Sequence, residues 1–462
     1  MGAIGIFKNR FVALFAVLLV CLSFDAAFAR DIYVKLSQSG KYSIGVTNGN
    51  IAMTDADGRL ANLSDSAVIS VSGNTANISG NVFNLPLRLT GQGFLKFNGR
   101  TYRGAFLITQ RAGLLNVLDV EQYLYGVLPA EVGAAWPTEA LRAQAIISRS
   151  YVLKRSLEVR AEKGYDVVDT DMDQVYKGQG VETAKTNSAV NSTAGEILTY
   201  GNEIAFTPFH SDSGGHTASN ADVWEKAFPY LTGVPEVVSY KSPVSTWTAR
   251  ISAAKIASVV AKLGGHIGQI TEIQVSEVDQ GGRAVKMTFV GTSGSKTIRA
   301  SQFRLAVDPR ALKSTMFTPS GGSFQVKANA STAEGLVTRN NSRAASALNF
   351  GEEQGLAGMT AEGVFTTTEL IDMLTNPNKK DQYYKIGLSR RGRTNTKAST
   401  PKPNTYGFTI ERSGNDFVFY GRGWGHGVGL SQWGCMAMAE KGWKAENILM
   451  HYYPGTSVRK FK

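Results

Sequence analysis

The apolar residues of this chain alternate with polar residues up to about residue 110, and from Val120 onward they recur every three or four residues. A period of two indicates strands and a period near 3.6 indicates helices, so this change divides the chain into two kinds of structure. The alternation is clearest over residues 32–36 and 42–46, and Asn48-Gly49-Asn50 supplies a turn signal after them. We therefore predict a β-rich region over residues 30–110.

Helices are predicted beyond this region. Residues 120–128 form one helical pattern, and Pro137 stands where the first residue of a second helix, ending near Arg155, is expected. One face of the second helix carries small and apolar residues: Leu141, Ala145, Ser148 and Val152. A smaller α/β pattern follows at 245–310, with a hairpin at 270–290 between helices at 253–263 and 300–307.

Residues 321–405 have a different composition, rich in Ser, Asn and Thr, with a basic run that includes Arg390, Arg391 and Arg393. Such a stretch is too polar to build a core, which favours an insertion or linker. The predicted fold class is α+β. A β-rich N-terminal part precedes a mixed α/β core over 111–320 and 406–462, and the small α/β subdomain at 245–310 is inserted in that core.

Residues 1–29 carry the three parts of a secretory signal: basic Lys8 and Arg10, an apolar run over 11–22, and Ala27-Phe28-Ala29 before Arg30. A membrane anchor is the alternative, but the run is short for a ~30 Å hydrocarbon core. We expect cleavage before Arg30 and a secreted, cell-wall or periplasmic protein. Cleavage would leave Cys435 as the single cysteine, without an internal disulfide.

The formal net charge of +12 limits the kinds of partner. For an exported chain it points to anionic wall polymers, peptidoglycan or lipid head groups rather than to nucleic acid. The basic run of 321–405 is the expected contact with wall polymers. The alternative is that the basic residues only keep the protein soluble.

Glu131 is the first candidate for chemistry. It ends the 120–128 helical pattern and precedes Val132-Gly133-Ala134-Ala135-Trp136, so its carboxylate has an apolar flank. Poor solvation disfavours the charged form and raises the pKa, as a general acid requires near neutral pH. The alternative is a surface glutamate at a helix end.

His210 and His216 flank a Gly214-Gly215 turn and are candidate metal ligands. Zinc takes at least three protein ligands, and Asp212 or Asp222 would have to supply the third. A polar loop with hydrogen-bonded histidines is the alternative, and we expect no cofactor.

Residues 421–429 have glycine at every second position. If extended, this segment has one face without side chains, which lets a backbone or a sugar approach closely, and Trp424 is placed to stack on a pyranose ring. Ser431 is placed to cap the following helix. A tight structural turn is the alternative.

Together these segments resemble the SpoIID/LytB family of sporulation protein D and amidase enhancers. The matching blocks run in family order: 121–127 with Pro129-Ala130-Glu131, 140–145, 149–151, 173–178, 210–216 with Val223-Trp224, 421–434 and 448–455. The resemblance covers about 110 to 460, apart from 321–405. Many members have Cys where Ser213 stands, and zinc is associated with this region of the family, so Ser213 weakens a carried-over metal site.

The resemblance implies a lytic transglycosylase that cleaves peptidoglycan glycan strands between N-acetylmuramic acid and N-acetylglucosamine and leaves 1,6-anhydro ends, with Glu131 as the catalytic acid. The expected substrate-binding residues are Gln144, Arg149, Gln174, Tyr176, Trp424, His426 and Gln432. One alternative is a non-catalytic module that binds peptidoglycan and stimulates a cell-wall amidase. Another is a zinc hydrolase built on His210 and His216. The sequence also leaves Asp173 open as a second acid.

Overall fold

The computed structural model describes residues 30–224, 226–319 and 408–461. The chain divides into two compact units: unit 1 comprises residues up to Phe206 with those from Val458 onward, and unit 2 runs from Thr207 to Ser457. This division falls inside the stretch 111–320 for which the sequence predicts one core. Within the described ranges, no helix is long and apolar enough to span a membrane. The predicted signal at 1–29 and the insertion at 321–405 lie outside the described residues.

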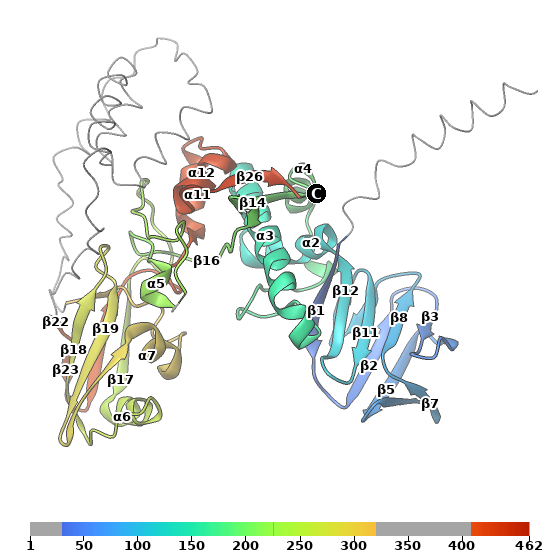
Figure 1. Ribbon diagram of the computed structural model, residues 1–462, viewed down its shortest axis with the longest axis horizontal. Coiled ribbons are helices and arrows are strands. Elements are labelled where there is room, and N and C mark those ends of the chain that lie inside the picture. Colours follow the sequence, from blue (N-terminus) through green and yellow to red (C-terminus); the bar gives the residue numbers. More distant parts are fainter. Residues whose placement is uncertain (1–29, 225, 320–407, 462) are drawn as a thin grey trace, which may run out of the picture. The chain divides into compact units, whose positions relative to one another are not determined.

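Unit 1 begins with the predicted β-rich region, which forms two antiparallel sheets (Figure 1). Their strands are β1 (Asp31–Ser37), β2 (Lys41–Val46), β3 (Ile51–Thr54), β4 (Leu60–Leu63), β5 (Ser66–Ser72), β6 (Thr75–Ile78), β7 (Asn81–Asn84), β8 (Leu87–Gly91), β9 (Leu95–Phe97), β10 (Arg100–Tyr102), β11 (Ala105–Thr109) and β12 (Gly113–Asp119). One sheet has the order β13-β1-β12-β11-β8-β3-β4, where β13 (Val167–Val168) joins β1 in parallel, and the other has the order β10-β9-β2-β5-β6-β7. The predicted alternation is confirmed in β2, whose Tyr42, Ile44 and Val46 are buried.

Two helices pack on this β structure. α2 (Val120–Glu131) begins where Asp119 accepts hydrogen bonds from the backbone N–H groups of Glu121 and Gln122. α3 (Thr138–Lys163) follows after Pro137 and ends at Gly164, whose φ of 76° is left-handed. It extends beyond the predicted end near Arg155 because no helix breaker occurs before Gly164. A single core holds side chains of both sheets and of both helices.

The rest of unit 1 is small. It consists of η1 (Gln179–Val181), α4 (Ala184–Ser192) and a three-stranded sheet of β14 (Glu196–Tyr200), β15 (Glu203–Ile204) and β26 (Ser457–Lys460). β26 returns the end of the chain to unit 1, where Phe461 N–H donates to the Gly195 carbonyl (2.7 Å).

Unit 2 contains the predicted α/β subdomain. Its helices α6 (Ala253–Lys262) and α7 (Ala300–Val307) and its hairpin β18 (Ile270–Val278) to β19 (Ala284–Gly291) match the prediction. The other elements of unit 2 are β16 (Phe209–His210), α5 (Asn220–Val223), β17 (Trp247–Ser252), β20 (Gly294–Arg299), β21 (Phe317–Thr318), β22 (Phe408–Thr409), β23 (Glu411–Ser413), β24 (Asp416–Gly421), β25 (Leu430–Ser431), α11 (Gln432–Glu440) and α12 (Ala445–Tyr452).

The subdomain is completed by residues from beyond the insertion. β22 pairs with β18, and β24 pairs antiparallel with β17 from Trp247 opposite Gly421 to Ser252 opposite Asp416. Phe417 and Phe419 of β24 are fully buried in the same core as β18, β19, α6 and α7. The fold of the 245–310 stretch therefore includes residues 408–421, and this same β24 leads directly into the glycine-rich segment.

Candidate functional site

Glu131 is the last residue of α2 and is half-buried. Its Oε1 accepts a hydrogen bond of 2.6 Å from the backbone N–H of Val175. Val175 belongs to the irregular segment 169–178 that follows β13. A carboxylate at a helix end is thus held by a backbone donor from elsewhere in unit 1, which fixes the orientation of the carboxyl group.

Asp173, which the sequence offered as a possible second acid, contacts three other groups. Its Oδ1 accepts from the Tyr151 hydroxyl (2.9 Å), and its Oδ2 accepts from the Val168 N–H (3.0 Å). Arg155 lies 3.4 Å from Oδ1. Burial and the neighbouring Asp173 raise the pKa of Tyr151, so its hydroxyl keeps its proton and donates it to this bond. These contacts give Asp173 a structural role in joining 169–178 to α3.

Gln174 and Tyr176 flank Val175 and are almost fully buried, at 0% and 1% exposure. Gln174 accepts from the Tyr123 hydroxyl (3.1 Å), and Tyr176 donates to Asn116 Oδ1 (2.7 Å). Both residues therefore adjoin Val175, whose N–H contacts Glu131, but their own side chains bond to other protein groups. Their burial lends no support to the direct substrate contact predicted for them.

Arg149 and Gln144, on α3, are also buried, at 0% and 1% exposure. Arg149 forms a two-pronged ion pair with Glu121 of α2 (2.8 and 2.6 Å) and donates to the Glu196 carbonyl (2.8 Å). Gln144 donates to Ser148 Oγ one turn further along α3 (3.1 Å). Arg149 thus connects α3 to α2 and β14, and Gln144 bonds within α3, so the burial of both side chains lends no support to the substrate contact predicted for them.

The other predicted site residues belong to unit 2, where the structure brings the 210–216 and 421–429 segments together. β16 runs parallel to β25, so that His210 lies opposite Ser431. Asp212 and Trp424 exchange backbone hydrogen bonds of 3.0 and 2.8 Å. Two motifs that are about 200 residues apart in the sequence therefore form one structure.

The glycine-rich segment is not extended. Gly423, Gly425, Gly427 and Gly429 have φ values of 72°, 121°, 89° and 71°, a region that side chains other than glycine rarely adopt. A Cβ at Gly425 would lie 2.5 Å from the Cβ of His210, and one at Gly429 would lie 2.0 Å from the Pro208 carbonyl oxygen. The expected close approach is thus made by this protein's own backbone, and the segment is a tight structural loop that ends where Ser431 caps α11.

Two histidines, His426 in this loop and His210 of β16, lie close together. His426 Nδ1 accepts from the Val428 N–H (3.0 Å), whereas His210 Nδ1 faces the Val428 carbonyl (3.1 Å) and therefore donates to it. The two rings lie 5.5 Å apart between centroids. Burial, together with Arg304 and Arg283, lowers the pKa of His426 to about 3, and burial with His426 nearby lowers that of His210. Both rings are neutral near pH 7.

A zinc ion does not fit the side chains at this place. Across the described part of the chain, no three His, Cys, Asp or Glu side chains are grouped so that they could hold a metal ion. His210 faces His426, while His216 Nδ1 bonds to the Thr217 carbonyl (2.6 Å). Ser213 donates its hydroxyl to Glu236 (2.6 Å) and provides no thiolate. We therefore assign no chemical step to zinc.

Trp424 is the predicted binding residue of unit 2 that is exposed, with 39% of its surface accessible. The Lys313 ammonium lies 5.4 Å from the centre of its ring.

Gln432, by contrast, starts α11 and is only 7% exposed. Trp224 was not predicted as a site residue, although it lies in one of the segments that resemble the family, and its ring lies 4.9 Å from that of His426.

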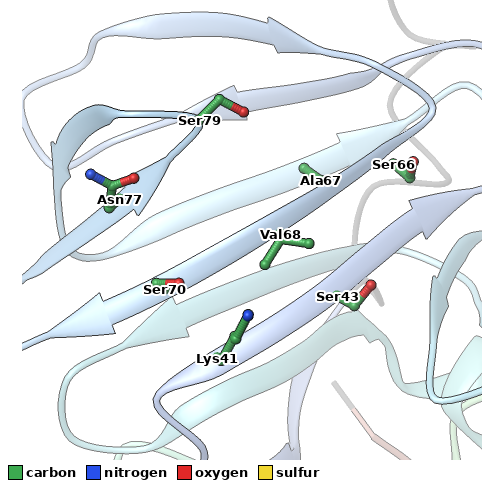
Figure 2. A pocket seen from close by; sticks show the side chains of 8 residues that line it. All are labelled: Lys41, Ser43, Ser66, Ala67, Val68, Ser70, Asn77 and Ser79. Carbon is green, nitrogen blue, oxygen red and sulfur yellow. The ribbon is translucent and has the colours of Figure 1, made fainter.

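A shallow cavity of about 440 Å³ lies elsewhere, on the outer face of β2, β5 and β6 in unit 1 (Figure 2). Half of its lining residues are serines, and the others are Lys41, Ala67, Val68 and Asn77. No carboxylate or histidine lines it, so it offers no carboxyl or imidazole group for acid–base chemistry.

Comparisons with known proteins match these segments. An uncharacterized protein of Brachyspira hyodysenteriae is 31% identical over 232 residues, which are 50% of this chain and 61% of that one. The amidase enhancer of Bacillus subtilis is 25% identical over 339 residues, 73% of this chain and 40% of the relative. The chain thus spans less than two thirds of the length of either relative.

Stage II sporulation protein D of Bacillus subtilis is 28% identical over 355 residues, which cover 74% of each chain. The family model described as SpoIID, stage II sporulation protein, matches residues 109–200, the part of unit 1 that holds α2, α3 and Glu131. The order of the motifs, the position of Glu131 at the end of α2 and these matches agree. Residues 109–200 therefore carry the pattern of the SpoIID family, and the longer matches make the chain similar to stage II sporulation protein D and to the amidase enhancer.

Proposed function

We propose that this protein is an exported lytic transglycosylase of the bacterial cell wall, with Glu131 as its acid and base. A role in the cell wall is supported by relatives named stage II sporulation protein D and amidase enhancer. The observation that carries the finer proposal is the contrast between two acids in unit 1. Glu131 stands at a helix end with its carboxyl group oriented by a backbone amide, whereas Asp173 is engaged by Tyr151, Arg155 and Val168.

One carboxyl group is enough for the lytic reaction. Glu131 donates its proton to the glycosidic oxygen between N-acetylmuramic acid and N-acetylglucosamine, and the bond to the anomeric carbon of muramic acid breaks. The carboxylate then takes the proton of the muramic 6-hydroxyl, whose oxygen bonds to that carbon. Glu131 is protonated again, and the product carries a 1,6-anhydro ring. A hydrolase would ordinarily need a second carboxylate to activate water or to attack the sugar.

Unit 2 is proposed to contribute to glycan binding through Trp424. An exposed indole can stack on the apolar face of a pyranose ring, and the loop of left-handed glycines holds this residue in place. Lys313, above the ring, adds a positive charge suited to the carboxylates of peptidoglycan.

A second candidate function is stimulation of an N-acetylmuramoyl-L-alanine amidase without catalysis. The amidase enhancer among the relatives favours it. In that case purified protein would bind sacculi and release no soluble sugar by itself.

Digestion of purified peptidoglycan in water enriched in ¹⁸O tests the proposal. The lytic route predicts soluble products with anhydro ends and no ¹⁸O, because the muramic hydroxyl attacks in place of water. Products with reducing ends that carry one ¹⁸O would identify a hydrolase instead. Release of no product would favour the enhancer.

A further inference from the structure

The hydrogen bond to Glu131 comes from a segment that has no regular structure of its own. Residues 169–178 connect β13 to η1 without helix or strand, yet the Val175 N–H lies 2.6 Å from Glu131 Oε1. A backbone donor in a free loop would move with that loop. The accuracy of this contact therefore depends on what holds the residues on either side of Val175.

Both neighbours are anchored in the core of unit 1. Gln174 donates through Nε2 to the Ser148 carbonyl of α3 (3.4 Å) and accepts through Oε1 from the Tyr123 hydroxyl of α2 (3.1 Å). Burial, with Asp173 and Glu131 nearby, raises the pKa of Tyr123, so its hydroxyl stays a donor. Tyr176 donates to Asn116 of β12 (2.7 Å).

The segment also lies directly on the helix that carries Glu131. The Lys177 N–H donates to the Gly126 carbonyl of α2 (3.3 Å). A Cβ at Gly126 would come within 2.5 Å of the Tyr176 ring and 2.8 Å of the Gly178 carbonyl oxygen. Only glycine permits this approach, which brings the segment and α2 into one rigid arrangement.

We propose that Gln174 is a positioning residue that holds the Val175 amide on Glu131, and that this amide stabilises the charged form of the Glu131 carboxyl group. A backbone N–H that donates to a carboxylate oxygen favours the ionised carboxylate over the protonated acid. This inference rests on the proposed acid and base role of Glu131. It replaces the predicted substrate contact of Gln174 with an action through the backbone.

The charged and titratable groups around this contact include Tyr123 of α2, Tyr151 and Arg155 of α3, and Asp173 and Tyr176 of the segment itself. Asp173 is paired with Arg155, and the three tyrosines are donors. Removal of the Val175 N–H leaves all of these groups in place. A change in the ionisation of Glu131 after that removal therefore reports the hydrogen bond itself.

The test replaces Val175 by its α-hydroxy acid in the full-length chain, so that an ester oxygen stands where the N–H was. Loss of a hydrogen bond to a charged group is expected to raise the apparent pKa of Glu131 by about one to two. It should lower kcat between about 10-fold and 100-fold while KM changes little. Gln174→Met, which removes both anchoring bonds, should shift the pH profile in the same direction. The control is an ester at exposed Met172 of the same segment, whose N–H donates to the Thr170 hydroxyl (3.4 Å), and it should leave the profile unchanged.

Carbon-13 NMR titration of the labelled Glu131 carboxyl group gives a readout that does not require activity. An unchanged Glu131 titration in the folded Val175 ester and in Gln174→Met would overturn the positioning role, even if Glu131→Gln is inactive. A raised pKa in both variants supports it, even if the reaction proves not to be transglycosylation. Activity of Glu131→Gln would instead contradict the proposed function.

Discussion

The two facing histidines of unit 2 make its stability depend on pH. Burial with Arg304 and Arg283 nearby lowers the pKa of His426 to about 3 in the folded protein, whereas an unfolded histidine titrates near 6.5. Between these values the unfolded chain binds a proton that the folded chain does not. The free energy of unfolding therefore rises with pH across this window and falls as the pH drops through it.

His426→Gln should weaken this dependence, because glutamine can accept the Val428 N–H but does not titrate. In denaturant unfolding at pH 7 and pH 5, the wild-type chain should lose about 1–2 kcal/mol more than the variant. His266→Gln, at an exposed position, is the matched control and should behave like the wild type. An equal loss in His426→Gln and wild type would show that His426 is protonated in the folded protein.

The role of a single residue could be predicted from the sequence where its neighbours in the chain determine that role. Glu131 at a helix end and Ser431 as a helix cap were predictable because a few neighbouring residues determine them. The donor to Glu131 was not, because it is a backbone N–H 44 positions away and leaves no side-chain signal. The burial of Gln174 and Arg149 could not be predicted for a related reason. Polar residues are mostly exposed, and they are buried where they have partners that the sequence does not reveal.

The Glu121–Arg149 ion pair joins α2, which carries Glu131, to α3. The Arg149 side chain is fully buried, and Glu121 also accepts the Gly195 N–H (2.9 Å), so the pair links three parts of unit 1. Charges that are buried this deeply need their partners, since a single buried charge is costly.

Arg149→Met is expected to reduce the free energy of unfolding by about 3–5 kcal/mol, because it removes the guanidinium that pairs with Glu121 and donates to the Glu196 carbonyl. Lys154→Met is the control on the same helix, since its partner Glu203 is 82% exposed, and it should cost less than about 1 kcal/mol. Chemical denaturation followed by circular dichroism measures both. Equal small losses would mean that the buried pair contributes little.

Helices and hairpins close in sequence were predicted well, because periodicity and turn residues act over short distances. α7 (Ala300–Val307) matches its predicted range, and α6 (Ala253–Lys262) ends one residue early. The pairing of β24 with β17 was missed, since the two strands are separated by the whole insertion. An extended form was one prediction for the glycine-rich segment. Its glycines instead have positive φ, because the segment packs against residues that are distant in the sequence.

The basic run within 321–405 bears on the predicted adhesion to anionic wall polymers. Its arginines and lysines lie outside the described residues, so their role in adhesion to anionic wall polymers remains a prediction from composition. Deletion of residues 378–398 should weaken binding to sacculi at low salt. The difference from wild type should shrink as salt shortens the screening length to about 8–10 Å. Pull-down at several salt concentrations measures this, and a large fall in melting temperature would show instead that the segment is structural.

Substitution of Glu131 by glutamine tests the central claim most directly. Glutamine keeps the size of the side chain and removes the proton that the reaction transfers. The control is Glu139→Gln, in the first turn of α3, where the carboxylate favours the helix dipole and lies 3.6 Å from Arg142. The measurement is the rate at which purified, folded protein releases soluble anhydro-sugars from peptidoglycan. The account predicts a loss of about 10²–10⁴-fold or more for Glu131→Gln, with binding to sacculi retained, and near wild-type release for Glu139→Gln. Wild-type release by Glu131→Gln would contradict it.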